Sequence, residues 1–174
     1  MSRFVYLDHS ATTPVDQRVI DAMMPFFAPD FGNPNSLHAW GRKARQAVDK
    51  ARNQVAQLIN AYPAEIIFTG GGSEADNLAI KGVAFAKKDK GRHIITSAIE
   101  HHAVLDTCNW LAKEGFDITV LPVDEYGMIR PDELERAIRP DTILVSIHFA
   151  NNEIGTVEPI EKIGNICRSH GVLF

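Results

Sequence analysis

Three consecutive glycines followed by a serine form the segment of this sequence that is best suited to hold a ligand. Gly70, Gly71 and Gly72 come after the apolar run of residues 66–68, and Ser73 opens a pattern typical of a helix. Glycines let the backbone turn sharply and approach a ligand closely. The first amides of a helix have no internal acceptor, and the helix dipole adds partial positive charge there, so this turn favours an anion such as phosphate.

A turn that binds nothing explains the same residues. Ser73 and Asp76 have the spacing of a capping box, which many helices use with no ligand nearby. Two familiar phosphate motifs do not match. A nucleotide-binding loop ends in Gly-Lys-Ser/Thr, but here Ser73 is followed by Glu74. The motif Gly-x-Gly-x-x-Gly needs a last glycine where this chain has Ala75. The glycines alone leave both interpretations open.

Two further polar clusters, residues 100–102 and residues 151–153, follow predicted strands. In parallel α/β sheets, ligands bind beyond the carboxyl ends of the strands, so all three clusters point to one site. Three polar clusters at the same end of one sheet are stronger evidence for a ligand site than any one of them. The adjacent histidines lack the spacing of a His-Glu-x-x-His site, so we expect no metal.

The order of the predicted elements indicates an α/β fold with a mostly parallel sheet flanked by helices. An extended arm, a helix capped by Asp16 and a long helix from about Ser36 come first. Strands then alternate with helices. The predicted strands are residues 66–69, 93–97, 117–122, 142–149 and a last one from 171, and the predicted helices are residues 73–87, 101–114, 131–139 and 159–169. Because the chain stops inside a predicted strand, we expect it to be the front part of a longer protein.

Composition narrows the class of protein. The chain has 174 residues, 45% of them hydrophobic, and a net charge of −4, which give no reason to expect binding to nucleic acid or to an acidic membrane surface. No apolar run approaches the length of a membrane span, so we expect a soluble, cytoplasmic protein. Cys108 and Cys167 fall on apolar helix faces, which predicts buried core residues rather than reactive thiols.

Five ordered motifs resemble those of the cysteine desulfurases of the NifS/IscS type, which belong to the class V aminotransferases. The motifs are Tyr-Leu-Asp-His-Ser-Ala-Thr-Thr-Pro at 6–14, Phe-Gly-Asn-Pro at 31–34, Phe-Thr-Gly-Gly-Gly-Ser-Glu at 68–74 with Asn-Leu-Ala-Ile-Lys-Gly at 77–82, Glu-His-His-Ala-Val-Leu at 100–105, and Asn-Asn-Glu-Ile-Gly at 151–155. The resemblance covers the whole chain, but only about the first half of what such an enzyme needs.

The resemblance implies a pyridoxal 5'-phosphate (PLP)-dependent transferase of fold type I, with residues 1–15 as an N-terminal arm and residues 16–174 as the front part of an incomplete PLP-binding large domain. It implies a homodimer that converts L-cysteine to L-alanine and an enzyme-bound persulfide. The sulfur would pass to an iron–sulfur scaffold or to another sulfur-acceptor protein.

The same resemblance assigns roles to four residues. Gly72 and Ser73 match the pair that binds the cofactor phosphate, His101 matches the catalytic histidine that stacks on the pyridine ring, and Asn152 matches the asparagine near the phenolic oxygen. The Schiff-base lysine and the catalytic cysteine are expected beyond Phe174, so we expect the chain alone to be inactive. Two alternatives stay open: another class V enzyme, such as a selenocysteine lyase or an aminotransferase, and a non-catalytic module that binds a phosphorylated ligand or a partner subunit.

Overall fold

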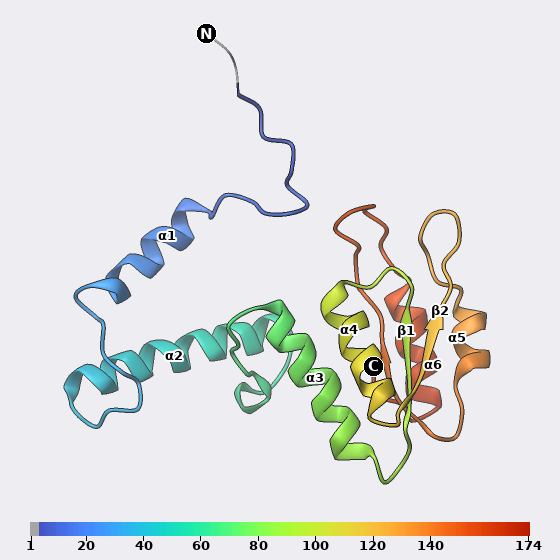
Figure 1. Ribbon diagram of the computed structural model, residues 1–174. Coiled ribbons are helices and arrows are strands. Elements are labelled where there is room, and N and C mark those ends of the chain that lie inside the picture. Colours follow the sequence, from blue (N-terminus) through green and yellow to red (C-terminus); the bar gives the residue numbers. More distant parts are fainter. Residues whose placement is uncertain (1–3) are drawn as a thin grey trace. The chain divides into compact units, whose positions relative to one another are not determined.

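The computed structural model describes residues 4–174 and divides into two compact units, Met1–Phe68 and Thr69–Phe174 (Figure 1). This division does not test the predicted boundary between residues 15 and 16, which stays a prediction. None of the helices in the described part of the chain has the length and apolar character that crossing a membrane requires.

The first unit consists of helices and connecting loops. Its elements are α1 (Gln17–Met23), the 3-10 helix η1 (Met24–Phe27), α2 (Ala39–Leu58) and the 3-10 helix η2 (Pro63–Glu65). The predicted cap of the first helix is confirmed, because the Asp16 carboxylate accepts a hydrogen bond of 2.8 Å from the Arg18 amide. The long helix begins three residues later than predicted, where the His38 ring accepts a hydrogen bond from the Gly41 amide.

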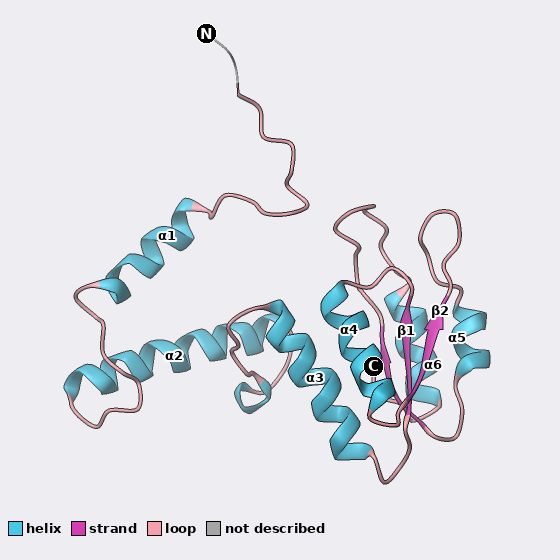
Figure 2. Cartoon of the chain, in the orientation of Figure 1, coloured by secondary structure: helices cyan, strands magenta, loops and turns pink. Residues whose placement is uncertain are grey.

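The second unit contains a three-stranded parallel sheet (Figure 2). Its elements are α3 (Gly72–Lys87), β1 (His93–Ser97), α4 (His102–Lys113), β2 (Asp117–Leu121), α5 (Pro131–Ala137), β3 (Thr142–Ser146) and α6 (Ile160–Ser169). The strand order is β2-β1-β3, so the first strand lies in the centre. All five residues of β1 are buried, as expected of a strand that helices cover on both faces.

Two apolar cores form because successive residues of a strand point to opposite faces of the sheet. Ile94 packs with α3 and α4, whereas Ile95 packs with α5 and α6. The sheet therefore lies between two layers of helices, and the predicted α/β class is confirmed. Cys108 belongs to the first core and Cys167 to the second, so the prediction that both are buried is also confirmed.

Two predicted strands are wrong or incomplete. Residues 66–69 form no strand, because the Ile66 carbonyl accepts a hydrogen bond from the Arg52 side chain and Ile67 is 69% exposed. At the end of the chain, Leu173 makes a single parallel bridge to Leu144 rather than a full strand. An apolar run becomes a strand only where a neighbour satisfies its backbone, and residues 4–174 provide no such neighbour for residues 66–69.

A buried histidine joins the three strands near their amino ends. The two ring nitrogens of His93 lie 2.7 Å from the hydroxyl oxygens of Thr142 on β3 and Thr119 on β2. Burial lowers the pKa of His93 below its ordinary value of 6.5, and the Arg139 charge lowers it further, although Asp117 and Asp141 oppose this effect. The folded state therefore favours the neutral ring.

We predict that this histidine makes stability depend on pH. The unfolded chain protonates His93 at about pH 6.5, whereas the folded chain resists protonation. The contribution of the neutral ring is thus fully present above that pH and is lost as pH falls toward the lowered pKa. Urea unfolding from about pH 8 to about pH 5 should show the decline in the wild type and in a control, His170→Gln, but a much smaller one in His93→Leu. An equal decline in all three would contradict this assignment.

Candidate active site

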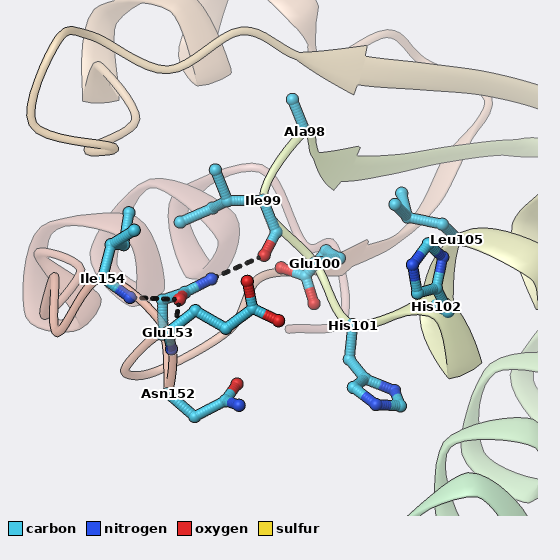
Figure 3. Close-up of a pocket in the computed structure, with 10 residues that line it drawn as sticks. Ala98, Ile99, Glu100, His101, His102, Leu105, Asn152, Glu153 and Ile154 are labelled. Atoms are coloured by element: carbon cyan, nitrogen blue, oxygen red, sulfur yellow. Dashed lines mark hydrogen bonds between the residues drawn. The ribbon is translucent and has the colours of Figure 1, made fainter. Parts of the chain in front are cut away.

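A pocket of about 350 Å³ lies just beyond the carboxyl end of β1 (Figure 3). Two loops line it, one that follows β1 and one that follows β3. The lining residues are Ala98, Ile99, Glu100, His101, His102, Leu105, Asn151, Asn152, Glu153 and Ile154. Two of the three polar clusters in the sequence therefore meet, as the rule for parallel sheets predicts.

His101 stands at the entrance to α4 and caps it. Its Nδ1 accepts a hydrogen bond of 3.0 Å from the Ala103 amide, which fixes the orientation of the ring. Because Nδ1 accepts, the neutral ring carries its hydrogen on Nε2. The side chain is exposed, and in Figure 3 the ring of His101 and the amide of Asn152 extend from their loops in a similar direction. A donor at Nε2 is thus available to a ligand in the pocket.

Asn151 holds the second loop in shape. Its Oδ1 accepts hydrogen bonds of 2.8 Å and 3.0 Å from the Glu153 and Ile154 amides. Its Nδ2 donates a hydrogen bond of 2.9 Å to the Ile99 carbonyl, so the same side chain also fastens the turn to the loop after β1. This arrangement fixes where the backbone of Asn152 lies relative to His101.

Glu100 provides a second fastening between the loops. Its Oε1 accepts hydrogen bonds of 3.0 Å from the Ser97 hydroxyl and 2.5 Å from the His148 amide. Burial raises the pKa of Glu100 above its ordinary value of 4.5, and Asp76 of α3 raises it slightly, while the two hydrogen bonds lower it. Glu100 directly precedes His101, and His148 lies in the segment that leads to Asn152. The Glu100 carboxyl group therefore joins the loop after β1 to the segment after β3.

The amino end of α3 carries the third cluster. The helix begins at Gly72, and its cap, Gly71, provides no side-chain acceptor for the first turn. Ser73 lies inside that turn rather than at the cap, so the capping-box interpretation is wrong. Gly72 and Ser73 are not among the residues that line the pocket. α3 nevertheless lies near the pocket, because it packs against α4, whose first turn contributes His102 and Leu105 to the lining.

Three residues that attract attention in the sequence lie outside the site. Burial raises the pKa of Cys108 to about 11 and also raises that of Cys167, so both thiols stay protonated near neutral pH. Lys81 lies with its Nζ 4.5 Å from the centre of the Trp110 ring, on the outer side of α3 and α4. The burial of both cysteines agrees with the prediction that they are core residues.

Sequence reasoning missed three residues that organise the pocket. Ser97 and His148 fall within or beside predicted strands, where a polar side chain attracts no notice. The third residue is Glu158. A charged residue interrupts the apolar stretch of Val157 and Pro159-Ile160 here, and this interruption is a signal that could have identified it. Both carboxyl groups of interest, those of Glu100 and Glu158, are buried.

The fold and the site define an α/β protein whose ligand pocket lies at the carboxyl edge of a parallel sheet. A family model described as aminotransferase class V matches residues 5–174. The chain belongs to the class V aminotransferase family.

Individual relatives agree with this assignment. The chain is 56% identical over 173 residues to cysteine desulfurase IscS from Methanosarcina thermophila, covering 99% of this chain and 43% of that protein. It is 55% identical to putative cysteine desulfurase IscS 1 from Bacillus subtilis strain 168, covering 98% and 45%. The chain therefore spans less than half the length of these curated relatives. The resemblance to cysteine desulfurases seen in the motifs is confirmed.

Solved structures share the fold. A chain titled "SspA in complex with cysteine" matches with a TM-score of 0.91 and 46% identity, covering 96% of this chain and 48% of that one. A NifS-like protein matches with a TM-score of 0.89 and 42% identity, covering 92% and 44%. These structural matches confirm the predicted fold.

We predict that Glu100 stabilises the site mainly as a hydrogen-bond acceptor. Glu100→Ala leaves the Ser97 hydroxyl and the His148 amide without their acceptor and should lower the free energy of unfolding by about 1–3 kcal/mol at neutral pH. Glu100→Gln keeps an acceptor oxygen and removes the buried charge, so it should be at least as stable as the wild type there. Urea unfolding measures both.

The pH dependence provides a further check on Glu100. Folding raises the pKa of Glu100. The stability that its protonated carboxyl group contributes is therefore fully present below about pH 4.5 and is lost as pH rises through the pKa of the folded state. The stability of the wild type relative to Glu100→Gln should therefore fall as pH rises from about 4.5 to neutrality. A constant difference would show that the carboxyl group has no raised pKa.

We predict that Asn151→Ala loosens the turn that carries Asn152. The Glu153 and Ile154 amides lose their acceptor, so their hydrogen exchange should speed up by about tenfold or more. Asn165→Ala, on the exposed face of α6, is the control and should leave both amides unchanged. Unchanged protection in Asn151→Ala would mean that the backbone alone holds the turn.

Proposed function

We propose that this chain forms the cofactor-binding part of a PLP-dependent cysteine desulfurase. The observation that carries the proposal is the pocket in which His101 and Asn152 meet from two different loops at the carboxyl edge of the sheet. The similarity to cysteine desulfurases over nearly the whole chain supports the same activity. The substrate in this proposal is L-cysteine, which would yield L-alanine and an enzyme-bound persulfide.

The residues present fit the cofactor. At the amino end of α3 no side chain caps the first turn, and a Cβ added at Gly71 or Gly72 would meet nothing within 4 Å. This open, amide-rich turn suits a phosphate group. The Glu74 carboxylate would oppose an anion, but it is turned back to accept a hydrogen bond of 2.6 Å from the Gly70 amide. In the pocket, an imidazole and a neutral amide suit an aromatic ring with a phenolic oxygen.

Each residue then has a distinct task. Gly72 and Ser73 would hold the phosphate through backbone amides and a hydroxyl group. His101 would face the pyridine ring and could hold or move a proton at Nε2, since Nδ1 is engaged in capping α4. Asn152 would donate a hydrogen bond to the phenolic oxygen. When bound, PLP supplies an electron sink for the reaction at the amino acid.

The proposal extends to the setting of the enzyme. It would work as a cytoplasmic homodimer and pass its sulfur to an iron–sulfur scaffold or to another acceptor protein. These assignments rest on the resemblance of the motifs and on the similarity to the curated cysteine desulfurases.

A substitution at Ser73 tests the phosphate site. In the natural gene product that carries this sequence, Ser73→Ala removes one hydrogen bond to a charged group and should weaken PLP binding by about tenfold or more. Binding of pyridoxal, which lacks the phosphate, should stay the same. Equilibrium titration followed by the absorbance of the bound cofactor measures both affinities.

A matched control comes from the same helix. Asn77→Ala, one turn further along α3, removes a side chain that donates a hydrogen bond of 2.9 Å to the Ser73 carbonyl and should leave both affinities close to those of the wild type. Equal loss of affinity for PLP and for pyridoxal in Ser73→Ala would contradict a phosphate contact at this residue.

A further inference from the structure

Glu158 is a buried acid that does not line the pocket. It lies between the 150–157 loop, which carries Asn152, and the start of α6, and only 3% of it is exposed. Its Oε2 accepts a hydrogen bond of 3.1 Å from the Ile129 amide, while Oε1 is buried and bonds to no residue within 4–174. A buried carboxyl group is costly, so its retention calls for an explanation.

Ile129 belongs to the 122–130 loop, which connects β2 to α5. This loop meets the 150–157 loop, or Glu158 directly after it, at three points. The first is the bond between Glu158 and the Ile129 amide. In the second, the Thr156 hydroxyl donates a hydrogen bond to the Tyr126 carbonyl. In the third, the side chain of Ile154 fills the space beside Gly127, where an added Cβ would lie 2.3 Å from its methyl group.

Each loop is stiff enough to support the other. In the 122–130 loop, the Asp124 carboxylate accepts hydrogen bonds of 2.9 Å from the amides of Tyr126 and Met128. In the 150–157 loop, Ala150 and Val157 pair as an antiparallel bridge around the turn held by Asn151. The two loops project together beyond the strand ends in Figure 1. Contact between them therefore limits how far the turn with Asn152 can move.

The charges around Glu158 favour a neutral carboxyl group. Burial raises its pKa, and the carboxylates of Glu100 and Asp124 raise it further, while the Ile129 hydrogen bond and His148 lower it. These groups come from the loop after β1, the 122–130 loop and the segment after β3. A neutral carboxyl group can accept the Ile129 hydrogen bond without placing a second negative charge close to Glu100.

We propose that Glu158 is a positioning residue, which clamps the 122–130 loop against the 150–157 loop and thereby sets where Asn152 stands in the pocket. The inference rests on the proposed function in one respect, the contact of Asn152 with the phenolic oxygen of PLP. Glu158 touches neither the ligand nor His101 in this account. Its loss alters recognition of the phenolic oxygen and leaves phosphate recognition intact.

Three variants of the natural gene product test the clamp. Glu158→Leu removes the acceptor, Glu158→Gln keeps an acceptor oxygen without a titrating group, and Glu161→Gln, three residues along on an exposed position, is the control. Hydrogen exchange of the Ile129, Glu153 and Ile154 amides, measured without cofactor, should speed up at least tenfold in Glu158→Leu. It should stay within threefold of the wild type in the other two.

A second measurement concerns Asn152. The preference for PLP over its 3-deoxy analogue, which lacks the phenolic oxygen, should fall about tenfold in Glu158→Leu, as in Asn152→Ala, and should be restored in Glu158→Gln. Thr156→Val removes another link between the loops with little change of volume, so it should shift the preference in the same direction. This variant replaces Glu158→Leu in the test if Glu158→Leu does not fold.

The outcomes separate the two proposals. Unchanged exchange in Glu158→Leu, or faster exchange with an unchanged preference in both Glu158→Leu and Thr156→Val, would overturn the positioning role. A wild type that does not distinguish PLP from the 3-deoxy analogue would refute the proposed contact of Asn152. In that case the exchange rates would still decide whether Glu158 clamps the loops.

Discussion

The candidate site depends on the fastening of two loops that leave neighbouring strands of the sheet. Parallel strands bring the ends of β1 and β3 to the same edge, but the chain beyond each end is free to diverge. The Glu100 carboxyl group, bound to the His148 amide, and the Asn151 amide, bound to the Ile99 carbonyl, prevent this divergence. Buried hydrogen bonds of this kind are costly to break, because each leaves a polar group without a partner.

This constraint explains why two buried acids lie in and near the site. Glu100 lines the pocket and organises its loops, and Glu158 supports them through its hydrogen bond to the 122–130 loop. Neither group has the environment of a freely ionising carboxyl, since burial raises both pKa values. The placement of His101 and Asn152 thus depends on neighbouring side chains that hydrogen-bond to the backbone of the two loops.

The sequence predicted most of the second unit. Alternating apolar runs and helical patterns identified β1, β2, β3 and four helices, because the strands are rich in apolar residues, most of all the central strand β1, which is buried throughout, and each helix has one apolar face. The predicted strand at residues 66–69 was wrong, since strand formation depends on a neighbour that local sequence does not reveal. The convergence of His101 and Asn152 followed from sheet topology alone, whereas the links made by Ser97, His148 and Glu158 depend on tertiary contacts that no motif encodes.

The most direct test of this account is a crystal structure of the natural gene product with PLP bound. The account predicts that the His101 and Asn152 side chains contact the same cofactor ring, with the phosphate at the Gly72 and Ser73 amides and with the Glu100–His148 and Asn151–Ile99 hydrogen bonds intact. A ring bound away from either side chain, or the two loops separated with both hydrogen bonds broken, would contradict it.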